Sequence, residues 1–299
     1  MAVDDRPSAA VPVLRDQRIL VLGPMSSVGG PVVRALAADN QVWGASRFRR
    51  DRGIADLEAQ GVHPVRVDLA DPDLDALPAE IDFVVNFAVS HAPDFATALA
   101  SNAENLGLVM ERARGAKAFL HCSSTGVYQP NGEHPMAETD PLGDNHRVLL
   151  PTYSISKIAA EVVARLACRQ HQLPTVIARL NVPYGPGVGL PAMHLECILT
   201  DTPVGVRPER TVYNPIHIDD IVRQVPALLA AADVPAPTVN WAGPDTVSVE
   251  EWCAYLGGLV GREGILAEDP TALGSVAVDT TLMDELIGAA RVRWQDGMH

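Results

Sequence analysis

A strand, a glycine-rich turn and a helix follow one another early in this chain, and this series most constrains its fold. Residues 18–22 form a short apolar run without alternation, which is typical of a strand buried on both faces. A glycine-rich turn follows at residues 23–30, and Val32, Val33 and Leu36 then recur at helical spacing. Such a unit can bind a dinucleotide, because glycines let the backbone approach a pyrophosphate and the helix N-terminus attracts its charge.

The turn departs from the usual glycine pattern. Its spacing is Gly23-x-x-Ser26-x-x-Gly29, with a serine in the middle position. A purely structural turn without a ligand is therefore the alternative to a dinucleotide site. If the turn binds a dinucleotide, the residues expected to contact it are Gly23, Ser26, Ser27, Val28 and Gly29.

Strand-like and helix-like segments alternate well beyond this unit. Further strands are predicted at residues 41–46, 63–69, 81–88 and 118–124, and residues 94–114 have helical periodicity. The alternation predicts an α/β fold with a Rossmann-type doubly wound parallel sheet. The expected organisation is a flexible tail over 1–16, an NAD(P)-binding Rossmann domain over 17–180, and a smaller, mainly substrate-binding C-terminal part over 181–299, of which 215–242 returns to the sheet.

The end of the second predicted strand bears on the choice between NADP and NAD. An NAD site usually places an acid there to hold the ribose 2′-hydroxyl. Here Ser46 is followed by Arg47, and Arg50 stands three residues further on. Arginine forks suit a 2′-phosphate, so we predict NADP, with NAD as the alternative. An exposed basic loop without a ligand would also account for these arginines.

The ends of the next two strands supply further candidate cofactor contacts. In doubly wound sheets, ligands bind beyond the carboxyl ends of the strands. Asp68 could accept a hydrogen bond from the adenine amino group, or could only cap the turn that follows it. The expected contacts at the two strand ends are Asp68 and Leu69 at the third strand and Phe87, Ala88 and Val89 at the fourth.

Tyr153 and Lys157 form a second candidate site. The apolar positions Ile155, Ala159 and Val162 predict a helix here, and residues four apart lie on the same side of a helix. A cation beside a phenol favours the phenolate, so we expect the pKa of Tyr153 to fall from about 10 toward neutrality. Tyr153 would then be a proton donor or acceptor; a chance pair on a solvated helix face is the alternative.

Several motifs, taken together and in order, resemble the NAD(P)-dependent epimerase/dehydratase family, the extended short-chain dehydrogenases/reductases. The resemblance extends from about residue 17 to the C-terminus. Besides the motifs above, it rests on Asn86-Phe87-Ala88, Asn102, residues 123–128 (SSTGVY), 179–186 (RLNVPYGP) and 217–220 (HIDD).

The resemblance implies a role for each matching residue. Ser124 would hydrogen-bond the substrate oxygen, Tyr153 would be the general acid/base, and Lys157 would bind the nicotinamide ribose and lower the pKa of the tyrosine. Further cofactor contacts are implied for Asn102 and Val182. Tentative substrate contacts are Ser124, Thr125, Asn181 and Tyr184.

The expected reaction is hydride transfer at a secondary alcohol or ketone, by an NAD(P)-dependent oxidoreductase or epimerase. The sugar-nucleotide dehydratases of the family carry Asp-Glu where Thr125-Gly126 follow Ser124 here, so dehydration is not expected. A non-nucleotide substrate is slightly favoured. The alternatives are a nucleotide-sugar 4-epimerase and, in another class, a non-catalytic dinucleotide-binding sensor or interaction protein.

Composition bears on partners and compartment. With a net charge of −14, the chain lacks the basic surface of a nucleic-acid binder and would be repelled by anionic membranes. Four scattered cysteines show no metal-binding spacing. We expect a cytoplasmic protein with a small-molecule substrate and no metal, nucleic acid or membrane partner; the resemblance implies a homodimer.

The C-terminal part carries weaker signals. Residues 187–213 are Pro-rich and are expected to form an irregular substrate lip, and Asp219 is the expected N-cap of a helix that runs to about residue 232. His91 and His134 are expected in loops near the mouth of the site, as surface histidines, with a catalytic role as the alternative. The sequence ends where family members have a last helix still to come, so the chain is either naturally short or truncated.

Overall fold

A parallel seven-stranded sheet forms the centre of the computed structural model, which describes residues 13–48 and 52–299. The strand order is β11-β6-β5-β4-β1-β2-β3, and every neighbouring pair is parallel. The predicted Rossmann-type fold is thereby confirmed. The strands are β1 (Arg18–Leu22), β2 (Gln41–Ser46), β3 (Val62–Arg66), β4 (Phe83–Asn86), β5 (Ala118–Ser124), β6 (Thr175–Leu180) and β11 (Thr238–Trp241).

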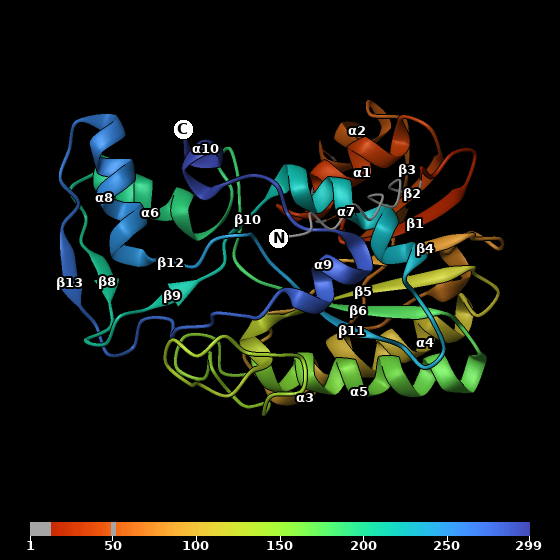
Figure 1. The fold of residues 1–299 in the computed structure, drawn as a ribbon. Coiled ribbons are helices and arrows are strands. Elements are labelled where there is room, and N and C mark those ends of the chain that lie inside the picture. Colours follow the sequence, from red (N-terminus) through yellow and green to blue (C-terminus); the bar gives the residue numbers. More distant parts are fainter. Residues whose placement is uncertain (1–12, 49–51) are drawn as a thin grey trace, which may run out of the picture.

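Helices cover both faces of the sheet (Figure 1). Successive strand residues point to opposite faces, so Ile19 of β1 belongs to one apolar cluster and Leu20 to the other. The first cluster includes residues of α1 (Gly29–Ala37), α7 (Ile218–Ala230) and α9 (Thr281–Ile287). The second includes residues of α4 (Asn105–Arg112) and α5 (Tyr153–His171). α2 (Arg52–Glu58) precedes the edge strand β3.

The predicted helical segment at 94–114 contains an irregularity. It begins as α3 (Phe95–Leu99), continues as a π-helical stretch over Ala100–Glu104, and ends as α4. The side chain of Asp94 caps α3 by accepting a hydrogen bond from the Thr97 N–H at 2.8 Å. The π-helical stretch contains Asn102, whose side chain turns inward and is buried.

A smaller lobe lies beyond the carboxyl ends of the strands (Figure 1). Its apolar cluster is built around Trp252, Tyr128 and Tyr213. The elements of this part are β7 (Pro183–Tyr184), α6 (Gly189–Leu199), β8 (Val204–Val206), β9 (Val212–Tyr213), β10 (Ile216–His217), β12 (Val247–Ser248), α8 (Val249–Val260), β13 (Leu266–Glu268) and α10 (Trp294–Met298).

Three local expectations need correction or adjustment. Residues 187–213 are not irregular, because they hold α6, β8 and β9; Pro191 lies in the first turn of α6, where its missing N–H costs no hydrogen bond. α7 begins at Ile218, so its N-cap is His217, whose Nδ1 accepts from the Asp219 N–H at 3.2 Å. Of the expected tail, residues 1–12 lie outside the described residues, whereas Asp16 donates a main-chain hydrogen bond to Asp39.

In the part of the chain that the structure describes, no helix is both long and apolar enough to cross a lipid bilayer.

Candidate functional site

The turn between β1 and α1 is held by the serine that makes its sequence unusual. The Ser26 hydroxyl donates to the Gly23 carbonyl and accepts from the Gly29 N–H, each at 2.9 Å. Gly23 has a φ of +78°, and a Cβ there would lie 2.8 Å from the Ala88 nitrogen. A Cβ on Gly29 would lie 2.3 Å from the Gly23 carbonyl oxygen. Both glycines are therefore required by close backbone approach, and Ser26 completes the turn.

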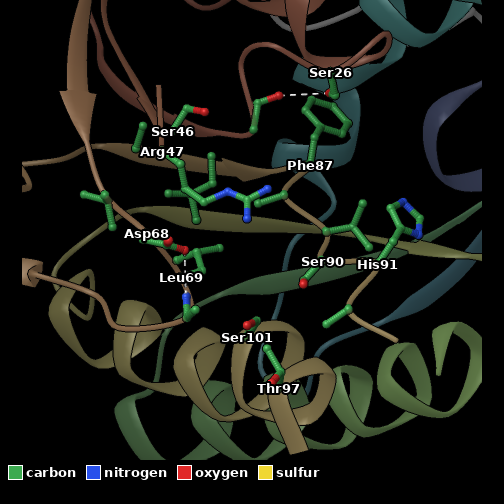
Figure 2. Close-up of a pocket in the computed structure, with 18 of the residues that line it drawn as sticks. Ser26, Ser46, Arg47, Asp68, Leu69, Phe87, Ser90, His91, Thr97 and Ser101 are labelled. Carbon is green, nitrogen blue, oxygen red and sulfur yellow. Dashed lines mark hydrogen bonds between the residues drawn. The ribbon is translucent and has the colours of Figure 1, made fainter. Parts of the chain in front are cut away.

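A cavity of about 620 Å³ opens at this turn and at the carboxyl ends of β1, β2 and β4. It is the expected place for a ligand in a doubly wound sheet. Figure 2 shows Ser26, Arg47, Asp68 and Phe87 around it. The predicted cofactor contacts that line this cavity are Gly23, Ser26, Arg47, Asp68, Leu69, Phe87, Ala88 and Val89.

Arg47 is the charged group that enters this cavity most directly. Its exposed side chain reaches from the end of β2 into the middle of the cavity (Figure 2). No salt bridge between Arg47 and another of the described residues is found. The Arg66 guanidinium donates to the main-chain carbonyls of Arg47 and Phe48 and so supports this segment. The predicted partner Arg50 lies outside the described residues.

Asp68 lines the same cavity and also caps a turn. Its Oδ1 accepts from the Ala70 N–H at 3.0 Å, and its main-chain carbonyl accepts from the Asp71 N–H at 3.1 Å. Asp68 thus has the structural role that was expected as the alternative, the capping of the turn that follows it. Its second carboxylate oxygen has no hydrogen bond to the residues that the structure describes, so a cofactor contact is compatible with the cap.

A second cavity, of about 370 Å³, brings the candidate catalytic residues together. Ser124, Tyr153 and Lys157 all line it, from the end of β5 and the first turns of α5. The other predicted contacts that line it are Ser26, Ser27, Val28, Phe87, Val89, Thr125, Asn181 and Val182. The two cavities adjoin, since both are lined by Ser26, Phe87, Val89 and His91.

The protonation of Tyr153 differs from the expectation. Burial raises the pKa of Tyr153 to about 12, although a hydrogen bond with Ser124 acts to lower it. The predicted fall of the Tyr153 pKa toward neutrality is therefore wrong. Lys157 does lie on the same side of the helix, but its Nζ donates to the Cys122 carbonyl at 2.6 Å. Burial lowers the pKa of the Lys157 ammonium.

A buried ion pair supports the end of β5 behind Ser124. The Ser123 hydroxyl donates to Glu161 at 2.7 Å, and Arg179 donates to both Glu161 oxygens at 2.9 and 2.8 Å. Although burial acts to raise it, the Arg179 guanidinium holds the pKa of Glu161 below its ordinary value. Glu161 lies four residues after Lys157 on α5, so the pair links the helix, β5 and β6. No motif or spacing in the sequence indicates this ion pair.

Three predicted contacts lie outside both cavity linings. Asn102 donates to the Ser90 carbonyl at 2.9 Å and accepts from its N–H at 2.7 Å, which holds the loop after β4. Tyr184 is buried, and its ring packs edge-on against His217. Gly29 is buried at the start of α1. Asn181 lines the second cavity, but its amide nitrogen donates to the Val276 carbonyl at 2.9 Å.

Two histidines adjoin Tyr153: His91, which was expected near the mouth of the site, and His146, which was not predicted. The rings of His91 and His146 each lie 5.5 Å from the Tyr153 ring, with interplanar angles of 11° and 29°. His91 is exposed, as expected, but it also lines both cavities. His91 lies two residues after the predicted cofactor contact Val89, so its place near the site could be predicted from the sequence. His146 lies in a loop without any motif.

Among residues 13–48 and 52–299, no three His, Cys, Asp or Glu side chains come together in a way that could hold a metal ion.

Comparison with protein families places this geometry in a known context. Residues 19–241 match the model of the NAD dependent epimerase/dehydratase family. A dTDP-4-dehydro-6-deoxy-D-allose reductase of a Streptomyces species is 26% identical, over 90% of this chain and 90% of the relative.

Solved structures show the same fold. A UDP-glucuronic acid 4-epimerase from Bacillus cereus, in complex with UDP-glucuronic acid and NAD, aligns with a TM-score of 0.81 at 21% identity, over 94% of this chain and 96% of that one. A UDP-N-acetylglucosamine 4-epimerase from Methanobrevibacter ruminantium M1 aligns with a TM-score of 0.82 at 15% identity, over 95% and 96%.

Proposed function

Because this chain belongs to the NAD dependent epimerase/dehydratase family, we propose that it is an NADP-using oxidoreductase that reduces a ketone to a secondary alcohol. The observation that carries the proposal is that Ser124, Tyr153 and Lys157 line one cavity, which adjoins the cavity at the glycine-rich turn. A non-catalytic sensor would not need all three groups at one place.

The proton of the reaction comes from Tyr153. With a pKa of about 12, its phenol is protonated at physiological pH and can donate to the carbonyl oxygen. Ser124 hydrogen-bonds that oxygen and polarises the carbonyl. When bound, the nicotinamide supplies the hydride that the carbonyl carbon accepts. Lys157, whose ammonium is fixed by the Cys122 carbonyl, is placed to hold the ribose hydroxyls and to stabilise negative charge on Tyr153.

The two adjoining cavities would share one dinucleotide. The adenosine half fits the first cavity, where Asp68, Leu69 and Arg47 lie, and the nicotinamide half fits the second. Ser26 lines both cavities and belongs to the turn before α1, where main-chain N–H groups and the helix dipole suit a pyrophosphate.

NADP is the proposed cofactor in preference to NAD. The support is the guanidinium of Arg47 in the first cavity (Figure 2). A 2′-phosphate offers two oxygens to such a planar fork, whereas a 2′-hydroxyl does not need a cation.

For the substrate we propose a ketone without a nucleoside diphosphate. Arg207 donates to the Ala272 carbonyl at 2.7 Å, and Arg210 is paired with Glu133 and Glu251. These two cations of the smaller lobe already have partners within the protein, so they do not offer a free positive charge to a nucleoside diphosphate. The second candidate is a dTDP-linked keto sugar, which the reductase activity of the Streptomyces relative favours, or a nucleotide-sugar 4-epimerase substrate, which is the class that the two structurally similar epimerases act on.

We also propose a homodimer that forms through α4 and α5. Val162 and Leu166 on α5 are 53% and 61% exposed, and Leu108 on α4 is 45% exposed. α5 lies along an outer edge of the molecule (Figure 1), so a second copy could cover this apolar face.

We also propose that the chain divides into a cofactor-binding and a substrate-binding part, and that the protein is cytoplasmic. A boundary near residue 180 would separate cofactor binding from substrate binding, in keeping with the separate apolar cluster of the smaller lobe. The four cysteines are all free thiols, which is the usual state in the cytoplasm.

Titration with NADPH and NADH, followed by fluorescence, tests the proposed function. We expect NADPH to bind more tightly than NADH, and Arg47→Ala to remove the difference. Tyr153→Phe should keep NADPH binding and lose turnover of ketones, whereas a sensor would be unaffected. Absence of binding of either nucleotide below millimolar concentration would contradict the proposal. A panel of simple ketones and dTDP-keto sugars then separates the two substrate candidates.

A further inference from the structure

The imidazole of His146 lies beside the proposed proton donor. His146 belongs to the loop between η3 (Thr125–Val127) and α5, and its ring lies 5.5 Å from the ring of Tyr153. The same imidazole lines the second cavity together with Ser124. A side chain that can donate and accept hydrogen bonds thus adjoins two groups of the proposed reduction.

Gly126 makes room for this imidazole. A Cβ on residue 126 would lie only 2.6 Å from the His146 Cε1 and 3.0 Å from each ring nitrogen. The main chain of Gly126 is itself fixed, because its N–H donates to the Ser124 hydroxyl and its carbonyl accepts from the Ser154 hydroxyl at 2.7 Å. The imidazole therefore fills the space that a side chain two residues after Ser124 would occupy.

One ring nitrogen of His146, the buried Nδ1, has no hydrogen-bond partner among the described residues, although the main chain of His146 is hydrogen-bonded. Buried polar groups are nearly always paired in folded proteins, so an imidazole that lines a cavity and has an unpaired nitrogen calls for a ligand or water. Burial lowers the pKa of His146 to about 4, so at neutral pH one ring nitrogen donates and the other accepts. A hydroxyl group matches this capacity.

We propose that His146 is a specificity-determining residue, whose imidazole hydrogen-bonds a hydroxyl on the carbon next to the carbonyl that Tyr153 protonates. The preferred substrates are then α-hydroxy ketones. This inference rests on the proposed reduction and adds to it the class of substrate. A site that is built to bond a hydroxyl discriminates strongly against an analogue that lacks it, because its own polar groups are then left unpaired.

Two ketones that differ by one hydroxyl group test the inference. The kcat/KM of the NADPH-loaded enzyme is measured for 3-hydroxy-2-butanone and for 2-butanone. We expect the hydroxy ketone to be preferred by about tenfold or more. His146→Phe keeps a ring against Tyr153 but removes both nitrogens, so it should lower the value for the hydroxy ketone to that for 2-butanone.

Two further variants separate hydrogen bonding from ring stacking. His91 lies at the same distance from Tyr153, so His91→Phe is the matched control and should leave the ratio of the two values unchanged. Gly126→Ala displaces the imidazole and should reduce the ratio although His146 is present. Circular dichroism and NADPH binding establish that each variant is folded; if Gly126→Ala is not, His146→Phe alone decides.

The inference and the proposed function fail in different ways. Equal values for the two ketones in the unaltered enzyme, or an unchanged ratio in His146→Phe, would overturn the role of His146 and leave the reduction standing. An enzyme that binds NADPH but reduces neither ketone would overturn the assigned substrate class. A protein that does not bind NADPH would overturn the proposed function itself.

Discussion

The Nζ of Lys157 donates a 2.6 Å hydrogen bond to the main-chain carbonyl of Cys122. This bond ties the N-terminal part of α5 to β5, two residues before Ser124, and it gives a hydrogen-bond partner to a lysine that is only 4% exposed. We expect Lys157→Met to lose turnover and to weaken NADPH binding, because the ammonium serves both the ribose and Tyr153. Fluorescence titration and ketone reduction measure the two effects; unaltered turnover would contradict the assigned role.

Removal of one charge from the buried ion pair should destabilise the fold strongly. Glu161→Gln leaves Arg179 buried without a full negative partner, which costs about 3–5 kcal/mol of unfolding free energy. Arg165 also contacts Glu161, at 3.3 Å, but its side chain is 33% exposed. Arg165→Ala is therefore the matched control, with an expected loss of up to about 1 kcal/mol. Urea denaturation measures both, and equal losses would contradict this account.

Buried histidines should make the protein more stable at pH 7 than at pH 5. Burial lowers the pKa of His146 and of His194 to about 4, and that of His121 well below its ordinary value. Between those values and about 6.5, the unfolded chain binds protons that the folded chain does not, so stability rises with pH. Between pH 5 and pH 7, each of the first two histidines contributes about 1–2 kcal/mol to this rise.

Urea denaturation at pH 5, 6, 7 and 8 measures this dependence. Stability should rise up to about pH 6.5 and then level off, and His146→Phe should reduce the slope. Arg179 holds down the pKa of Glu161 against the effect of burial. Protonation of Glu161 therefore adds a further loss of stability when the pH falls below the ordinary pKa of a glutamate. Stability that increases toward pH 5 would contradict the prediction.

A charge on the exposed face of α5 should separate the proposed dimer. Val162→Glu together with Leu166→Glu places two carboxylates on this apolar face, at positions that are exposed in the single chain, so the fold should be kept. Light scattering after size-exclusion chromatography should show a dimer for the unaltered protein and a monomer for the variant. Arg169→Glu, in the last turn of the same helix, is a control for added charge alone.

The sequence by itself determined the architecture and, together with the family resemblance, the three candidate catalytic residues. Apolar runs and helical spacing are local properties, and they are enough to predict the parallel sheet and to place Tyr153 and Lys157 on one side of a helix. The glycine-rich turn was also readable, because Gly29 closely approaches the Gly23 carbonyl within the turn and Gly23 itself has a φ of +78°, a conformation that favours glycine. Such local signals can be recognised in the sequence without knowledge of the tertiary contacts.

Only the tertiary structure decided the protonation state of the site and its remaining members. Burial, which depends on the whole fold, keeps the proton on Tyr153 when local spacing predicted its loss. Glu161 meets Ser123, which is 38 residues away in the sequence, and no periodicity signals such a pair. The same holds for His146, whose place beside Tyr153 follows from the path of a loop and from the space left at Gly126. The tertiary structure decides these features because hydrogen bonding and burial join residues that are distant in sequence.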